Sequence, residues 1–216
     1  KVVCVGAGAA GVACSDLLIA AGADKNKFFM VDRHGVIRSD RAQYNNGEKP
    51  RFVNDAGPKT LSEACDGADI LLGVSGPGLI TEDDLMHLAP KAVVFACSNP
   101  DPEVEPELVA RSDYPNQINN VLCFPFLFRG TLDVRATCIN QEMKLAAMQA
   151  IRELAQEPVP AEVVKAALVD KLEFGPEYVI PKPMDPRLFK KVSRAVAQAA
   201  VDSGVAQIPM PENYMA

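Results

Sequence analysis

Basic residues are fewer than acidic ones in this sequence, and histidines are almost absent. The chain has 22 lysine and arginine residues against 28 aspartate and glutamate residues, a formal net charge of −6. Proteins that bind nucleic acid need clustered basic side chains to neutralise phosphates, so we expect no nucleic-acid partner. The two histidines, His34 and His87, are too isolated in the sequence to indicate a metal site in this chain.

Long apolar runs and paired cysteines are missing too. No run approaches the length of about 20 apolar residues that a membrane-spanning helix needs, and no signal-peptide pattern is present, so we expect no membrane partner. None of the six cysteines belongs to a CxxC pair, which argues against structural zinc and against a disulfide framework. Reduced and mostly buried thiols, as in a cytoplasmic protein, are expected instead.

The composition is otherwise that of an ordinary globular protein. Of the 216 residues, 48% are hydrophobic and 23% are charged. This length fits one domain, or one domain with an appended helical segment. Residue 1 already lies inside a predicted strand and no methionine precedes it, so we expect the sequence to be part of a longer chain.

The first residues contain the most informative pattern. An apolar run over residues 2–5 predicts a buried parallel strand, and it leads into Gly6-x-Gly8-x-x-Gly11 and then into a helical pattern that ends at Gly22. Glycines so spaced allow a tight turn, a close approach of backbone N–H groups to a pyrophosphate, and close packing of helix on strand. The helix N-terminus favours the negative charge of that pyrophosphate. We therefore predict a dinucleotide-binding loop made of Gly6, Ala7, Gly8, Ala9, Ala10 and Gly11.

An acidic residue stands where such a loop requires one. The apolar run 28–31 ends in Asp32, 32 − 11 = 21 residues after the third glycine, which is the spacing of a carboxylate that binds the adenosine ribose. The alternative is an α/β turn that binds no cofactor. The basic residues that follow, Arg33, Arg38 and Arg41, either contact a 2′-phosphate or belong to a solvated loop, and the sequence leaves both possibilities open.

Two further apolar runs, residues 70–74 and 93–97, predict more buried strands. The fold class expected is therefore α/β, a doubly wound parallel sheet of Rossmann type with C-terminal helices. The second run leads into Asn99, at the edge of the sheet where ligands bind in such folds, although a turn residue before proline would look the same. Residues 112–120 are rich in amides, and local chemistry alone favours a loop there.

Helical periodicity dominates the remainder. Asn140 is placed to cap a helix that Pro158 ends, and a last helix begins at Asp185-Pro186 and closes at Gly204. We therefore expect an NAD(P)-binding domain over residues 1–139 and a C-terminal helical segment, packing on it, over residues 140–216.

Several stretches together resemble the malic enzymes in their compact bacterial form. They are Gly6-Ala-Gly-Ala-Ala-Gly11, Ser98-Asn-Pro-Asp-Pro-Glu103, the long run 112–137 and the tail 174–186. The glycine motif is generic to dinucleotide binding, whereas the run 112–137 is specific. The resemblance implies oxidation of (S)-malate with NAD or NADP, decarboxylation to pyruvate and CO2, and dependence on Mg²⁺ or Mn²⁺.

The resemblance also implies roles for individual residues. The loop from Ala7 to Ala10 would hold the pyrophosphate, and Asp32 the adenosine ribose, with Arg33 beside it. The residues that would line the path to the nicotinamide are Ser75 and Gly76. Those that would bind the substrate carboxylate or the nicotinamide carboxamide are Asn99 and Asn119, with Asn120 next to them.

The chain departs from the family pattern in two places. In the family, the tyrosine and lysine that act as acid and base, and the carboxylate metal ligands, precede the glycine loop, so no catalytic residue and no metal ligand is expected here; Tyr114 and Lys182 do not match them. The family also has a further strand just before Ser112, and here that segment is deleted or unrecorded. Asp32 by its charge favours NAD, but the neighbouring basic residues favour NADP slightly.

The leading hypothesis is the cofactor-binding half of a malic enzyme, inactive alone, with malate and pyruvate as substrate and product. Its expected partners are an N-terminal malic enzyme domain and further copies of itself. A non-catalytic nucleotide-binding or assembly module, with helices 143–154 and 188–201 as its interface, is one alternative. Another Rossmann dehydrogenase of amino or hydroxy acids is a second, against which the run 112–137 argues.

Overall fold

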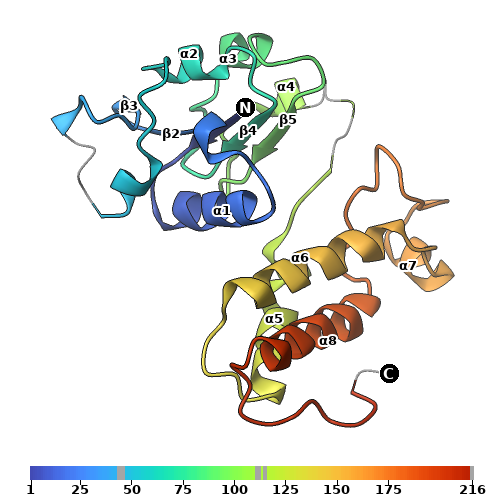
Figure 1. The fold of residues 1–216 in the computed structure, drawn as a ribbon. Helices are drawn as coiled ribbons and strands as arrows, with labels where there is room; N and C mark the ends of the chain where they lie inside the picture. The colour runs from blue at the N-terminus through green and yellow to red at the C-terminus, as the bar shows by residue number, and fades with distance from the viewer. Residues whose placement is uncertain (43–46, 110–112, 114–115, 215–216) are drawn as a thin grey trace. The chain divides into compact units, whose positions relative to one another are not determined.

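The computed structural model describes residues 1–42, 47–109, 113 and 116–214. The chain forms two compact units, Lys1–Ser112 and Asp113–Ala216 (Figure 1). The expected boundary after residue 139 lies 139 − 112 = 27 residues later than this division. The difference arises because helix α5 (Phe124–Asp133) packs against the C-terminal helix α8 (Arg187–Asp202) and so belongs to the second unit.

A five-stranded sheet forms the centre of the first unit, in the order β3-β2-β1-β4-β5. The strands are β1 (Val2–Val5), β2 (Phe28–Asp32), β3 (Gly35–Val36), β4 (Ile70–Gly73) and β5 (Val93–Ala96). All neighbours are parallel except β3, which runs antiparallel to β2. The strand order reverses at β1, so the carboxyl ends of β1 and β4 form a topological switch point, where ligands bind in open α/β sheets.

Helices cover both faces of this sheet (Figure 1). Alternate residues of β1 point to opposite faces. Cys4 packs in a cluster with Val12 and Leu18 of α1 (Ala9–Ala20), whereas Val3 packs in a cluster with Ala64 of α2 (Leu61–Cys65). Helix α3 (Glu82–Met86) lies on the same face as α2. The predicted doubly wound α/β fold is confirmed.

The short helices of this unit begin at side-chain caps. The Thr60 hydroxyl oxygen accepts a hydrogen bond from the Glu63 N–H, and the Glu63 carboxylate accepts one from the Thr60 N–H, so these residues form a capping box at the start of α2, as the spacing Thr60-Leu-Ser-Glu63 predicts. Thr81 and Asp84 form the same arrangement at the start of α3. The remaining short helices are η1 (Lys25–Lys27), η3 (Lys49–Phe52) and α4 (Pro106–Val109).

Strand β5 is the last strand of the sheet in the part of the chain that the structure describes. Its side chains Val93 and Val94 are 47% and 39% exposed. The segment where the family has a further strand, just before Ser112, falls on residues outside the described ones.

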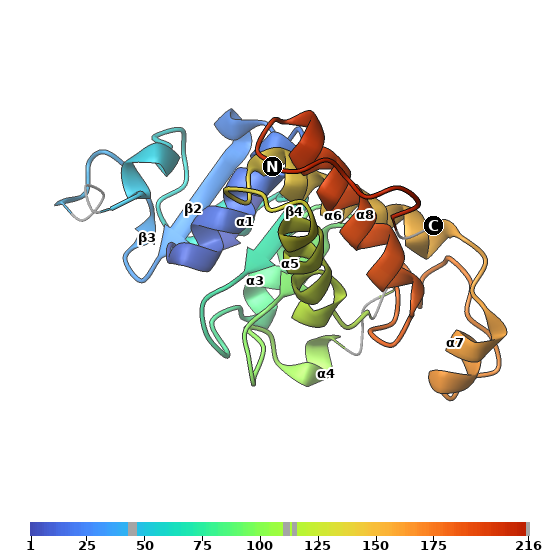
Figure 2. The same ribbon diagram turned by 90° about the horizontal axis from the view of Figure 1, so that it is seen from below.

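The second unit is a helical assembly (Figure 2). It consists of η4 (Asn120–Leu122), α5, α6 (Gln141–Gln156), α7 (Ala161–Ala166) and α8. Its core lies between α5, α6 and α8. Gly130 lets α5 approach α8 closely, because a Cβ there would lie 2.4 Å from the Ser193 carbonyl oxygen. Asn140 caps α6 as predicted, through a hydrogen bond from the Met143 N–H at 3.0 Å.

All six cysteines are free thiols. Only Cys4 and Cys65 are buried, whereas Cys97 and Cys138 are exposed, so the expectation of mostly buried thiols is wrong. Burial raises the pKa of Cys4 to about 11 and that of Cys65 to about 12.

Among the described residues, no helix is long and apolar enough to cross a bilayer, and no three acidic, histidine or cysteine side chains are grouped as metal ligands.

Candidate cofactor site

The turn between β1 and α1 needs glycine at two positions, for reasons of backbone conformation and packing. Gly6 has φ = +125°, and a Cβ on it would lie 2.7 Å from the Val74 carbonyl oxygen. A Cβ on Gly11 would lie only 1.8 Å from the carbonyl oxygen of Gly6. These two glycines therefore let α1 begin directly against the carboxyl ends of β1 and β4.

The fold places no such demand on Gly8. It has φ = −86°, which any residue adopts, and a Cβ on it would meet no atom within 4 Å. As the N-cap of α1 it has no side chain, no acidic residue occupies the first turn, and Ala9 and Ala10 are exposed. The first N–H groups of the helix thus face open space without a side-chain cap, as the binding of a phosphate requires.

Asp32, at the carboxyl end of β2, is held by two cations. The Nη2 group of Arg41 donates to both of its carboxylate oxygens at 2.8 Å, and Lys49 Nζ donates to Oδ2 at 2.7 Å. The His34 N–H adds a third donor, at 2.8 Å. The Asp32 side chain is only 8% exposed, so the cations and not solvent satisfy its charge.

Arg41 is anchored, whereas Lys49 has donors to spare. The Nη1 group of Arg41 donates to the carbonyl oxygens of Gly35 and Val36, at 2.8 and 2.7 Å. Among the described residues, the Lys49 ammonium group makes one of the three hydrogen bonds that it can donate, and its side chain remains 21% exposed. The ammonium group of Lys49 is therefore the better placed of the two to contact a ligand.

Arg33 and Arg38, the other two arginines that follow Asp32 in the sequence, have hydrogen-bond partners other than Asp32. Arg33 Nε donates to His34 Nε2 at 3.2 Å, and Arg38 is paired with Asp40 and with backbone carbonyl groups. The contact of Lys49 with Asp32 was missed by the sequence reasoning. No local pattern indicates it, because the two residues lie 17 positions apart in the sequence.

The ionisation of Asp32 makes the stability of the folded chain depend on pH. Burial raises the pKa of the Asp32 carboxyl, but hydrogen bonds from Lys49, the adjacent backbone N–H and Arg41 outweigh it, so the net pKa lies below the ordinary value. A lowered folded-state pKa stabilises the protein above the unfolded-state pKa of about 3.9, and this stability is lost as the pH falls through the folded-state pKa. We expect the melting-temperature gap between the native chain and Asp32→Asn to narrow as the pH falls below about 4. A gap that stays constant between neutral and acidic pH, followed by circular dichroism, would contradict this prediction.

The loops after β4 and β5 lie beside the glycine turn. A Cβ on Gly6 would lie 3.2 Å from the Ser75 Cβ, so Ser75 borders the loop directly. Glu103 connects the two loops, because its carboxylate accepts hydrogen bonds from the Ser75 N–H at 2.8 Å and the Ser98 N–H at 3.0 Å. Ser75 and Asn99 are exposed and Gly76 is half-buried, so all three are accessible to a ligand.

The other predicted amides belong to the second unit. Asn119 caps η4 by accepting a hydrogen bond from the Val121 N–H at 3.0 Å, and both Asn119 and Asn120 are exposed. Asn116, which the sequence reasoning did not select, joins its loop to residues 176–179 through hydrogen bonds to the Pro176 carbonyl and from the Val179 N–H. Tyr114 lies outside the described residues.

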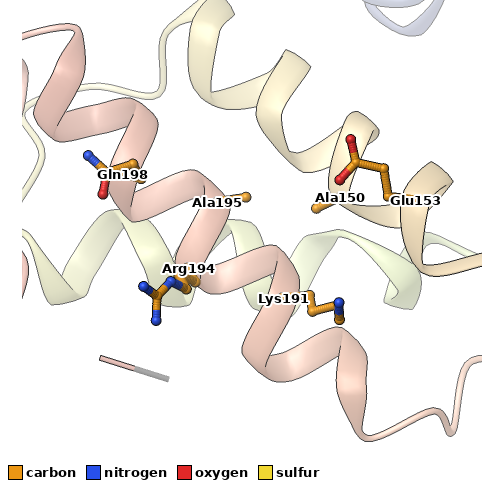
Figure 3. A pocket seen from close by; sticks show the side chains of 6 residues that line it. All are labelled: Ala150, Glu153, Lys191, Arg194, Ala195 and Gln198. Atoms are coloured by element: carbon orange, nitrogen blue, oxygen red, sulfur yellow. The ribbon is translucent and has the colours of Figure 1, made fainter. Parts of the chain in front are cut away.

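A shallow hollow of about 320 Å³ lies between α6 and α8 (Figure 3). Its lining contains none of the predicted site residues; it consists of Ala150, Glu153, Lys191, Arg194, Ala195 and Gln198. The two basic side chains in it already have partners, since Lys191 is paired with Glu157 and Arg194 donates to the Tyr214 carbonyl at 2.9 Å. The hollow therefore adds nothing to the cofactor site.

Comparison with known proteins identifies relatives over the whole chain. The family model described as malic enzyme, NAD binding domain, matches residues 1–114. An NADP-dependent malic enzyme of Halomonas elongata is 52% identical over 99% of the chain and 53% of its own length. An NADP-dependent malic enzyme of Salmonella typhimurium is 49% identical over 98% of the chain and 30% of its own length. An NAD-dependent malic enzyme of Rhizobium meliloti is 39% identical over 98% of the chain and 29% of its own length.

Solved structures give the same result. The crystal structure of Entamoeba histolytica malic enzyme matches with a TM-score of 0.83 and 29% identity, over 100% of this chain and 46% of that one. That of the malic enzyme from Pyrococcus horikoshii matches with a TM-score of 0.82 and 31% identity, over 100% of this chain and 51% of that one. The chain thus spans about half of the length of these relatives, or less. The alignment with the Halomonas elongata protein covers 225 residues, 225 − 216 = 9 more than the chain has, so some residues of the relative have no counterpart here.

Proposed function

The chain belongs to the malic enzyme family, as a member that contains its NAD-binding domain, and from this premise we propose that it binds NADP for the oxidative decarboxylation of (S)-malate to pyruvate and CO2. One observation carries the proposal. The uncapped N-terminus of α1, with open space over Gly8, lies at the switch point of the sheet, next to the strand end where Asp32 holds two cations.

The placement of the cofactor follows from the strand order. A pyrophosphate over the residues from Ala7 to Ala10 would point its adenosine end toward the end of β2, on one side of β1, and its nicotinamide end toward β4 and β5, on the other. Ser75, Gly76 and Asn99 are exposed or half-buried on that second side. Bound NADP supplies the hydride acceptor, and the residues of this chain orient it.

The charges beside Asp32 support NADP over NAD. Two cations face one carboxylate there, a net charge of 2 − 1 = +1, and two donors of Lys49 have no partner within the described ranges. A 2′-phosphate on the adenosine ribose would add the negative charge that this cluster can accept. In this proposal Asp32 orients Arg41 and Lys49 in addition to facing the ribose, and Arg33 adds positive charge nearby.

Neutral amides orient a carboxylate or a carboxamide without adding charge, so we assign Asn99, Asn119 and Asn120 to malate or to the nicotinamide. The acid, the base and the Mg²⁺ or Mn²⁺ ligands come from an N-terminal malic enzyme domain, so this chain alone is inactive.

We also propose a homo-oligomer and a cytoplasmic location, the latter supported by six cysteines that form no disulfide. The family match does not favour an assembly module or a different dehydrogenase.

Titration of the 216-residue chain with NADP and with NAD, with malate oxidation assayed alongside, tests this proposal. We expect binding of both cofactors, tighter for NADP, without turnover. Failure to bind either cofactor would contradict the proposal, and turnover by this chain alone would contradict the assignment of acid, base and metal to another domain.

A further inference from the structure

Glu103 is a buried carboxylate without a basic partner in the described part of the chain. Its side chain is fully buried, and the partners recorded for its two oxygens are backbone N–H groups, those of Ser75 and Ser98. Burial of a charge is unfavourable unless hydrogen bonds replace its hydration. A residue of this kind is therefore expected to serve a purpose that an apolar side chain at the same position would not.

The lack of a side chain at Gly73 leaves space for the Glu103 carboxylate. A Cβ on Gly73, the last residue of β4, would lie 2.7 Å from Glu103 Cδ and 2.9 Å from its Oε2. Gly73 has an ordinary backbone conformation, so its lack of a side chain is explained by the contact with Glu103 and not by a turn.

Backbone contacts join the same two loops. The Gly78 N–H donates to the Pro102 carbonyl at 3.2 Å, and the Ile80 N–H donates to the Glu103 carbonyl at 3.0 Å. Together with the hydrogen bond from the Ser75 N–H to the Glu103 carboxylate, they connect the loop after β4 to the loop after β5. The carboxylate bonds are the ones nearest the sheet edge, because Ser75 and Ser98 follow the strands almost directly.

We propose that Glu103 is a positioning residue, which holds the loops after β4 and β5 at the separation that the nicotinamide end of the cofactor requires. Through the Ser75 N–H it fixes the residue that borders Gly6, and through the Ser98 N–H it fixes the residue before Asn99. This inference rests on the proposed function, because it assigns to Glu103 a part in binding the same cofactor. It predicts that Glu103 matters for the nicotinamide half of NADP and not for the adenosine half.

The variant Glu103→Gln tests the role with almost no change in volume. A glutamine has only one acceptor oxygen, and its amide nitrogen would face the second backbone N–H, so one of the two loops is released. In the 216-residue chain we expect Glu103→Gln to bind NADP at least tenfold more weakly, and to bind 2′,5′-ADP, which lacks the nicotinamide half, within twofold of the native chain. Glu105→Gln, at an exposed carboxylate two residues away, is the matched control and should change neither affinity.

A second variant tests the same contact from the other side. Gly73→Ala keeps the charge but displaces the carboxylate from its place beside β4, so it should produce the same selective loss of NADP affinity. If either variant loses affinity for both ligands equally, or unfolds, Glu103 is a core residue and the positioning role is wrong. If NADP affinity is unchanged in Glu103→Gln, the inference fails while the proposed function stands. If the native chain binds neither ligand, the proposed function itself fails.

Discussion

Gly11→Ala is expected to unfold the first unit and to abolish cofactor binding with it. The added Cβ would lie 1.8 Å from the carbonyl oxygen of Gly6, and this neighbour cannot move aside as a flexible side chain would. Gly6 is fixed by the hydrogen bond from its N–H to the Val31 carbonyl at 2.9 Å. Alanine gains about 1 kcal/mol over glycine in a helix, but the displacement of α1 should cost about 3 kcal/mol or more.

Gly8→Ala is the matched control, because it adds the same methyl group three positions earlier in the chain. That methyl group meets no atom of the fold, so the free energy of unfolding should stay within about 0.5 kcal/mol of the native value. It would, however, occupy the space above the helix N-terminus, and NADP affinity should fall. Thermal unfolding by circular dichroism and NADP titration separate the two effects. A stable Gly11→Ala, or a Gly8→Ala that binds NADP as the native chain does, would contradict the assigned geometry.

Lys49→Ala is expected to remove most of the preference for NADP. Its ammonium group contacts Asp32 at 2.7 Å and has no second partner in the part of the chain that the structure describes, so it is the cation most available to a 2′-phosphate. Loss of one charge-assisted hydrogen bond of about 2 kcal/mol corresponds to about a 30-fold loss of NADP affinity. NAD affinity should change little, because Arg41 still donates to both oxygens of Asp32. The measurement is the ratio of NAD and NADP dissociation constants in the same chain.

Arg33→Ala serves as the comparison for Lys49. Arg33 directly follows Asp32 in the sequence, but its guanidinium donates to His34 and its side chain is exposed. It should therefore lower NADP affinity much less than Lys49→Ala does. A larger effect at Arg33, or an equal loss of NAD and NADP affinity in Lys49→Ala, would place the 2′-phosphate elsewhere.

The parts of the fold that the sequence predicted depend on short-range chemistry. Residues 2–5 form a strand, and Gly6 to Gly8 form the turn into α1, because apolar runs and glycine spacing act within a few residues. The capping box from Thr60 to Glu63 and the cap at Asn140 are equally local, since a cap joins residues three positions apart. The dinucleotide motif and the doubly wound sheet were therefore predictable before the structure was known.

Contacts between distant segments were decided by the tertiary structure. Lys49 reaches Asp32 across 17 residues, and Glu103 reaches the Ser75 N–H across 28, with no periodic pattern to announce either contact. The boundary between the two units, before α5, also depends on a contact between distant segments. Gly130 has no side chain, and this lets α5 pack closely against α8. Sequence alone determined that this chain forms a dinucleotide-binding sheet and turn, since those signals are local. Which side chains surround Asp32, and which one ties the loops of the site together, depended on the path of the chain in space.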